Sequence, residues 1–163
     1  MNDTNENKLD LYMELRKLVL GLHRKDTKPE DMDKVNAVLV DTNDGRKTFS
    51  VAAVIDGNCS LYFDNGQYII GLGKDPDIAD AAKQFASKAV ESLPDTKPVT
   101  DTEILPEPFY RTFYLITDGG IYRTIAPTDS PMGMPPAQMH LTSLLSALLR
   151  AIHNSPALKQ AEG

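Results

Sequence analysis

The sequence predicts an α+β domain in which three helices pack on an antiparallel sheet of five or six strands. In three separate segments, apolar residues recur every three or four positions, which is the spacing of one helix face. Between the first two segments the spacing falls to near two, and Asp-Gly and Asn-Gly turns follow in quick succession. The chain has 163 residues, 41% of them hydrophobic and 25% charged. We therefore expect a single domain over residues 1–163, with 1–7 and 156–163 as frayed ends.

The first helix is predicted over residues 7–23. Its apolar stripe is Leu11, Tyr12, Leu15, Leu18, Val19 and Leu22. Residues 24–34, RKDTKPEDMDK, contain many charges and one proline without any period, which predicts a solvated connection.

A meander of three or four strands is predicted next, at residues 35–42, 46–55, 59–63 and 67–73. The turns between these segments are Asn43-Asp44-Gly45, Asp56-Gly57-Asn58 and Asp64-Asn65-Gly66. Glycine and asparagine tolerate the positive φ of tight hairpins, so neighbouring strands are expected to run antiparallel.

The second helix is predicted over residues 76–93, with Pro94 at its end. Its apolar face is Ile78, Ala82, Phe85, Ala89, Val90 and Leu93. Residues 94–108 hold four prolines and several acids, so we expect an irregular connection that contains no regular element.

Two further strands, 109–117 and 121–126, are predicted around the turn at Asp118-Gly119-Gly120. Alternation puts Phe109, Arg111, Phe113 and Leu115 on one face of the first strand and Tyr110, Thr112, Tyr114 and Ile116 on the other. Both faces carry large apolar groups, which favours a central strand covered on both sides. After a loop at 127–139, the last helix is predicted over 140–154. Its apolar stripe is Leu141, Leu144, Leu145, Leu148, Leu149 and Ile152. The order is α-β-β-β-(β)-α-β-β-α.

This order of elements is similar to that of roadblock and profilin-like domains over residues 7–155, although no motif is shared. The resemblance implies a small antiparallel sheet with helical cover that dimerises or serves as a binding platform. In the roadblock pattern the longer run of strands follows the middle helix, whereas here it precedes that helix. The stretch SLYFDNGQYIIGLG, followed by an alanine-rich helix, also resembles a bacterial family without assigned function.

Charge and composition disfavour several classes of partner. The formal net charge is −6, and the basic residues are scattered among acids, which argues against nucleic acid. No apolar run is long enough for a membrane span, and the N-terminal segment does not resemble a secretory signal. The only cysteine is Cys59, so an intrachain disulfide is impossible and a cytoplasmic location is expected.

Three candidate reactive sites are weak. The stretch GLGKDPDIAD (71–80) superficially resembles a phosphate loop, but Asp75 and Asp77 open the helix and would repel a phosphate. Cys59 is expected to pack as a small hydrophobic residue because no base stands near it in the sequence. Asp41, Asn43 and Asp44 lack the glycine and glutamate spacing of a calcium loop. We therefore expect no cofactor and no metal.

Two groups remain as candidates for binding a partner. Met132, Met134 and Met139, with His140, lie close together in the 127–140 loop. They would either staple the loop to the last helix, dock another protein, or bind soft Cu(I). Arg111, Tyr114 and Tyr122 on the late strands belong to residue types that are enriched in binding sites.

The function that the sequence favours is a cytosolic, non-enzymatic protein-binding or dimerisation module that resembles the roadblock/profilin-like type. Its contact surface would be the sheet, the 127–140 loop or a first helix paired with its own copy. A second hypothesis is a small-molecule pocket, enzymatic or not, beneath residues 94–108 and lined by Arg111, Tyr114 and Tyr122. A third is an acidic immunity-type or inhibitor protein that neutralises a basic partner.

Overall fold

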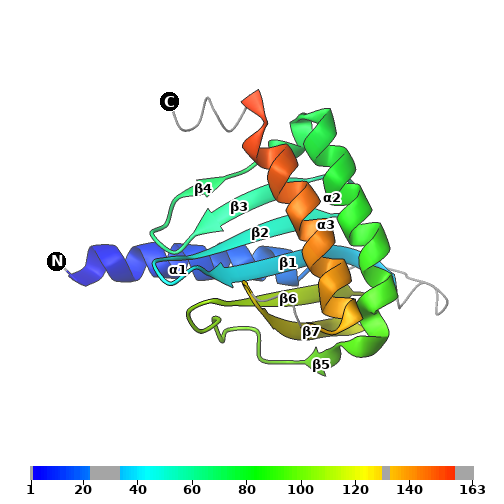
Figure 1. Cartoon of the computed structure of the whole chain (residues 1–163). Coiled ribbons are helices and arrows are strands. Elements are labelled where there is room, and N and C mark those ends of the chain that lie inside the picture. Colours follow the sequence, from blue (N-terminus) through cyan, green and yellow to red (C-terminus); the bar gives the residue numbers. More distant parts are fainter. Residues whose placement is uncertain (1, 23–33, 130–132, 157–163) are drawn as a thin grey trace.

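The computed structural model describes residues 2–22, 34–129 and 133–156. In this part of the chain, seven strands form one antiparallel sheet in the order β4-β3-β2-β1-β6-β7-β5, so the predicted α+β class is confirmed. Helices α2 and α3 pack on one face of the sheet and α1 lies on the other (Figure 1). The elements are α1 (Asn2–Leu20), β1 (Val35–Asn43), β2 (Thr48–Val54), β3 (Cys59–Phe63), β4 (Tyr68–Ile69), η2 (Leu72–Lys74), α2 (Pro76–Ala89), η3 (Val90–Asp95), β5 (Lys97–Val99), β6 (Tyr110–Thr117), β7 (Gly120–Pro127) and α3 (Pro136–His153).

The larger core fills the space between the sheet and the helices α2 and α3. Both helices turn the apolar faces predicted from the sequence toward the sheet. The buried members are Ile78, Ala82, Phe85 and Ala89 from α2 and Leu141, Leu145, Leu148 and Ile152 from α3. Alanine at two of these positions lets α2 approach the strands closely.

A smaller core lies between the sheet and α1. Its buried members are Tyr12, Val19 and Leu20 from α1 and Ala37, Leu39, Ala52, Tyr62, Tyr114 and Ile116 from the strands. A helix with its side chains is only about 10–12 Å wide, whereas seven strands spaced roughly 4.8 Å apart span about 29 Å. The single helix α1 therefore covers only part of this face. Residues 100–109, which we call the strap, cross the part over β6 and β7, and Leu105 of the strap joins the smaller core.

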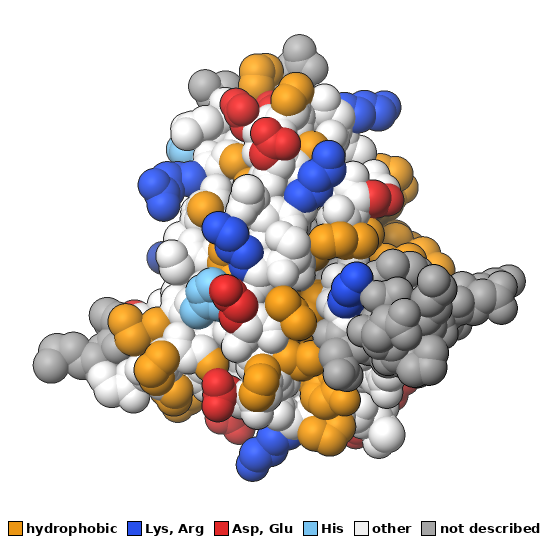
Figure 2. Space-filling view, turned by 90° about the vertical axis from the view of Figure 1, so that its right-hand side faces the viewer, with side chains coloured by type: hydrophobic (Ala, Val, Ile, Leu, Met, Phe, Trp, Pro, Cys, Tyr) orange, Lys and Arg blue, Asp and Glu red, His pale blue; other side chains and the backbone are white. Residues whose placement is uncertain are grey.

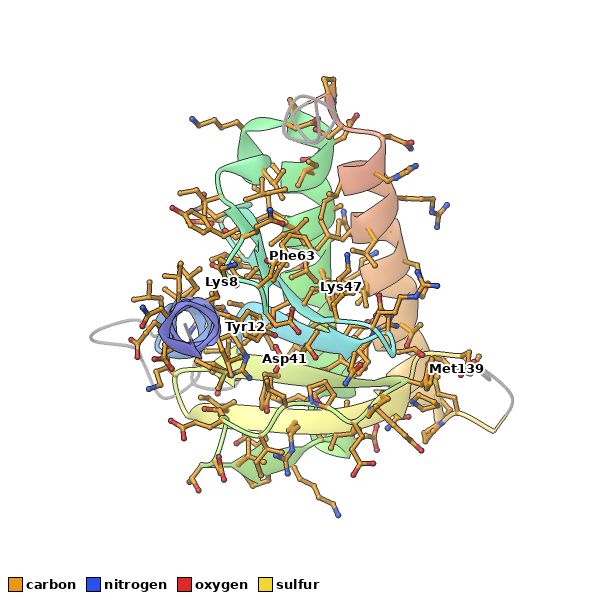
Figure 3. All side chains as sticks on the ribbon, turned by 90° about the vertical axis from the view of Figure 1, so that its left-hand side faces the viewer. Lys8, Tyr12, Asp41, Lys47, Phe63 and Met139 are labelled. Atoms are coloured by element: carbon orange, nitrogen blue, oxygen red, sulfur yellow. The ribbon has the colours of Figure 1, made fainter. Side chains whose placement is uncertain are left out.

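Strand β6 is central and covered on both faces, as predicted. It pairs with β1 on one side and with β7 on the other. Phe113 and Leu115 enter the larger core, whereas Tyr114 and Ile116 enter the smaller one. The two layers of cover are visible in Figure 3, where α1 is seen almost end-on on the opposite side of the sheet from α2 and α3.

The strand count exceeds the prediction because of residues 94–108. Residues 97–99 pair with Ile121–Arg123 as the edge strand β5, although the connection was expected to be irregular throughout. Only three residues pair, and Pro98 among them has no N–H to donate, which is typical of an edge position. The segment carries no apolar alternation, so its pairing depends on the neighbouring strand and was not predictable locally.

Other element ends also differ from the prediction. α1 begins at Asn2, before the predicted residue 7, and α3 begins at Pro136, four residues before the predicted start, because proline is compatible with the first turn of a helix. The segment predicted as strand 67–73 pairs only at Tyr68–Ile69 and then forms η2. α2 ends at Ala89, and the chain tightens into η3, which leaves Val90 37% exposed instead of on the buried face.

Phe109 departs from the predicted alternation. It precedes β6, has a φ of 68° and is 55% exposed, so it does not share the buried face of Phe113. Its ring lies over Gly45, where an added Cβ would come within 2.6 Å of the ring. Positive φ is uncommon for a bulky residue, and the bond from the Phe109 N–H to the Asn43 carbonyl (2.8 Å) helps to hold this conformation.

Candidate functional site

A buried charged centre joins α1 to the sheet. The Arg16 guanidinium donates to both carboxylate oxygens of Asp41, with distances of 3.1 Å from Nε to Oδ1 and 2.5 Å from Nη2 to Oδ2. The two side chains are 1% and 0% exposed. Burial by itself lowers the pKa of Arg16, but the hydrogen bonds and charge of Asp41 outweigh it and raise that pKa. The buried guanidinium therefore depends on the Asp41 carboxylate for compensation.

Two hydroxyl groups complete this centre. Ser50 Oγ donates to Asp41 Oδ1 at 2.6 Å. Because a hydroxyl has only one proton, the Tyr12 hydroxyl must be the donor in its 2.6 Å bond to Ser50 Oγ. Burial, followed by the nearby negative charge of Asp41, raises the pKa of Tyr12. Figure 3 shows Tyr12 reaching from α1 toward the sheet near Asp41.

The same centre holds the strap in place. Arg16 Nη2 donates to the Thr102 carbonyl at 2.9 Å, and the Tyr114 hydroxyl donates to the Ile104 carbonyl at 3.4 Å. The Tyr114 ring lies 5.9 Å from the Arg16 guanidinium carbon, within the range of a cation–π contact. Asn43 Nδ2 donates to the Pro106 carbonyl at 3.0 Å and fixes the far end of the strap.

Between the strap and the sheet lies a cleft of about 260 Å³, which we call the strap cleft. The strap forms one wall, and alternate residues of β6 and β7 form the floor, as expected for side chains on one face of a sheet. The lining residues are Ile104, Leu105, Pro106, Glu107, Tyr110, Thr112, Tyr114, Arg123 and Ile125. A cleft thus exists where the small-molecule hypothesis placed one.

The predicted lining residues are only partly correct. Tyr114 lies in the strap cleft, but Arg111 and Tyr122 point to the opposite face of the sheet. Tyr122 packs against the larger core. Arg111 donates from Nε to Thr42 Oγ1 at 3.1 Å, and burial lowers the pKa of its guanidinium. Because side chains along β7 alternate between the two faces of the sheet, Tyr122 and Arg123 point to opposite faces. Arg123 is therefore the arginine that lines the strap cleft.

The methionine-rich segment forms a second hollow. Met132 lies outside the described residues. Met134 is half-buried against the larger core, and its sulfur is 3.8 Å from the Thr142 hydroxyl, whereas Met139 is 49% exposed. Both line a depression of about 340 Å³ together with Thr128, Asp129, Thr142 and Ser143.

His140 is directed away from these methionines. Its Nε2 lies 2.9 Å from Glu91 Oε2 in η3 and 3.1 Å from the Lys88 carbonyl near the C-terminal end of α2. Within the described residues, no group of three or more His, Cys, Asp or Glu side chains is placed to hold a metal ion.

The stretch GLGKDPDIAD has a structural explanation. Gly71 adopts a φ of 77°, and a Cβ on Gly73 would collide with the Gly57 carbonyl oxygen of the β2–β3 turn. Asp75 caps α2 by accepting from the Asp77 N–H at 2.9 Å and also accepts from Ser155 Oγ at 2.9 Å. The glycines therefore permit close backbone packing, and a carboxylate already occupies the N-terminal end of α2.

Cys59 is buried in the larger core. Burial raises the pKa of its thiol to about 12. The thiol is therefore protonated at neutral pH, as the sequence interpretation of a packed hydrophobic residue expects.

The exposed side of α1 carries a row of leucines. The predicted stripe of α1 divides in the structure, because Tyr12, Arg16, Val19 and Leu20 face the sheet. Leu11, Leu18 and Leu22 are 41%, 70% and 38% exposed, and Leu15 is half-buried. We call these four leucines the leucine stripe. Sequence periodicity found these leucines but grouped them with Tyr12 and Val19 in one stripe, because the pattern does not show which part of an apolar face the sheet covers.

Comparison with known protein families, with curated proteins and with solved structures found no match to the chain. The resemblances to roadblock and profilin-like domains and to a bacterial family therefore stay predictions. No helix in the described ranges is long and apolar enough to cross a membrane. On the face that Figure 2 shows, basic and acidic side chains are interspersed, without a continuous basic track for a phosphate backbone.

Proposed function

We propose that this chain is a cytosolic, non-enzymatic protein-binding module that works as a homodimer joined through the leucine stripe of α1. The observation that carries the proposal is the exposure of Leu11, Leu18 and Leu22 along the border of the α1 face that packs on the sheet, where Leu15 contacts the smaller core. Leucines spaced three and four apart form a continuous apolar row along a helix, and such rows pair with other helices.

A second copy is the occupant that the spacing favours. The intervals from Leu11 to Leu15, to Leu18 and to Leu22 are four, three and four residues, which read the same in both directions. A two-fold axis between Leu15 and Leu18 of two antiparallel helices would place Leu11 opposite Leu22 of the second copy. Two-fold interfaces require such a self-complementary surface.

Burial of the stripe offsets much of the free-energy cost of dimerisation. Two copies of the stripe expose the equivalent of about three complete leucine side chains, and burying each contributes roughly 1.5–3 kcal/mol. The resulting ~5–9 kcal/mol is comparable to the cost of lost translational and rotational freedom, about 4–15 kcal/mol. The stripe alone therefore only offsets this cost, and association at tens of micromolar, which needs a net free energy of about −6 kcal/mol, requires that the two copies also bury surface beside the stripe.

Light scattering coupled to size-exclusion chromatography tests this proposal. The wild type at tens of micromolar is expected to have the mass of two chains, and Leu18→Glu is expected to have the mass of one. Leu18 is 70% exposed, so a glutamate there is compatible with the folded monomer but would be buried without a partner in the dimer.

Leu9→Glu is the matched control. Leu9 is 43% exposed, close to the 41% of Leu11, but two residues along a helix correspond to about 200° around its axis. The control variant should therefore remain dimeric. A wild type that is strictly monomeric at tens of micromolar, or a dimer that Leu9→Glu and Leu18→Glu weaken equally, would contradict the proposed interface.

The proposed cytosolic location has support from Cys59. A free thiol in the core is compatible with a reducing compartment, where thiols persist without forming disulfides.

A further inference from the structure

The strap cleft combines an apolar interior with one basic group. Its apolar walls come from the strap and from Tyr110 and Ile125, which are 43% and 50% exposed at the cleft. The strap itself is held by the bonds from Arg16 to Thr102 and from Asn43 to Pro106. The cleft is therefore formed by segments that are fixed on both sides, which is typical of a preformed ligand site.

Arg123 supplies the positive charge of the cleft. It is half-buried and hydrogen-bonded to the Tyr114 side chain. Burial and the charge of Asp41 raise the pKa of Tyr114, whereas the charge of Arg16, followed by the hydrogen bond and the charge of Arg123, counters them. Among the described residues, no carboxylate forms an ion pair with Arg123. Glu107, the one acid of the lining, is exposed on the strap. A half-buried guanidinium without a carboxylate partner favours an anionic ligand, and its two parallel N–H groups match a carboxylate.

The volume of the cleft limits the size of the ligand. A cavity of about 150 Å³ accepts benzene, which has six carbon atoms. In proportion, the strap cleft at about 260 Å³ would accept a ligand of roughly ten non-hydrogen atoms. This is the size of a phenyl ring with a short carboxylated chain.

We propose that the strap cleft binds a small aryl or alkyl monocarboxylate, with its apolar part between the strap and Ile125 and its carboxylate on Arg123. The Tyr114 hydroxyl, whose proton is directed to the Ile104 carbonyl, forms the neighbouring polar part of the floor. The site lies beneath the strap and uses none of the leucine stripe, so it is independent of the proposed dimer.

Titration of isotope-labelled protein with 3-phenylpropionate, followed by amide chemical shifts, tests the site. Two probes of the same shape, 3-phenylpropanol and 3-phenylpropylamine, replace the carboxylate by a neutral and a cationic group. We expect shifts that saturate with the acid and are confined to residues 104–107, 110–114 and 123–125. Because a charge-assisted hydrogen-bonded pair is lost, Arg123→Gln should weaken binding of the acid roughly 10- to 100-fold.

Arg46→Gln provides the control for a general loss of positive charge, because Arg46 is exposed in the β1–β2 turn, and it should bind the acid like the wild type. No shift with the acid at millimolar concentration would overturn the proposal, as would equal binding of the alcohol or unchanged binding to Arg123→Gln. If Arg123→Gln does not fold, the comparison of the acid, the alcohol and the amine in titrations of the wild type decides. Preference for the acid with shifts at the cleft supports the site, and any other pattern overturns it.

Discussion

Removal of one partner from the buried Arg16–Asp41 pair should destabilise the fold far more than removal of both. Asp41→Asn keeps the shape of the side chain but removes the negative charge, and its amide group would face the Arg16 donors. The guanidinium, 1% exposed, would then be buried without a counter-charge. Breaking a buried pair in this way costs about 3–5 kcal/mol, a large share of the ~5–15 kcal/mol that stabilises a typical domain.

Arg16→Met should cost a similar amount for the opposite reason. Asp41 would retain only the Ser50 hydroxyl as a side-chain donor among its described contacts, and the strap would lose the bond to the Thr102 carbonyl. In the double variant Arg16→Met/Asp41→Leu no charge is buried. Apolar replacements of buried ion pairs are often neutral or stabilising, so the double variant should lie within about 1–2 kcal/mol of the wild type.

Urea unfolding followed by far-ultraviolet circular dichroism measures these differences, since the chain has no tryptophan to report by fluorescence. Lys17→Met is the control, because Lys17 forms only exposed ion pairs, at 3.5 Å with Glu14 of the same helix and at 3.6 Å with Glu103 of the strap. The three side chains are 51%, 69% and 68% exposed. Such a pair contributes about 0–1 kcal/mol. Single variants that cost less than about 1 kcal/mol, or a double variant as unstable as the sum of the singles, would refute the argument that burial makes the two charges interdependent.

Three further predictions concern the core and the start of α2. Because burial raises the pKa of the Cys59 thiol from 9.0 to about 12, the unfolded chain loses this proton first as the pH rises. The contribution of Cys59 to stability should be complete below pH 9 and decline up to about pH 12, and Cys59→Ala should flatten that decline in thermal unfolding. Gly73→Ala should cost about 1–3 kcal/mol or more in urea unfolding, because its Cβ would collide with the Gly57 carbonyl; a cost below 0.5 kcal/mol would contradict this contact. Asp75→Ala should lower the free energy of unfolding by about 1 kcal/mol, because the helix cap is lost. An unchanged midpoint of urea unfolding would contradict this role of Asp75.

Local sequence pattern was sufficient for most of the elements. The faces of α2 and α3 follow from apolar residues that recur with the helical period, and the hairpin turns follow from glycines that must accept positive φ, as Gly45 and Gly57 do. The alternation in β6 also predicted correctly that Phe113 and Tyr114 lie in different cores. These features depend on a few neighbouring residues, so they can be determined without knowledge of the remaining chain.

Contacts between distant segments were decided only by the tertiary structure. Arg16 and Asp41 each interrupt an apolar pattern, and their pairing across 25 positions required α1 to pack on β1. Arg123 reaches the strap cleft, while Arg111 does not, because the strap crosses one face of the sheet and no local pattern states which face. The leucine stripe was visible in the sequence, but its exposure was not, since burial depends on what else covers a helix. Period and turn chemistry act over a few residues, whereas burial, charge pairing and cleft formation are properties of surfaces that meet only after folding.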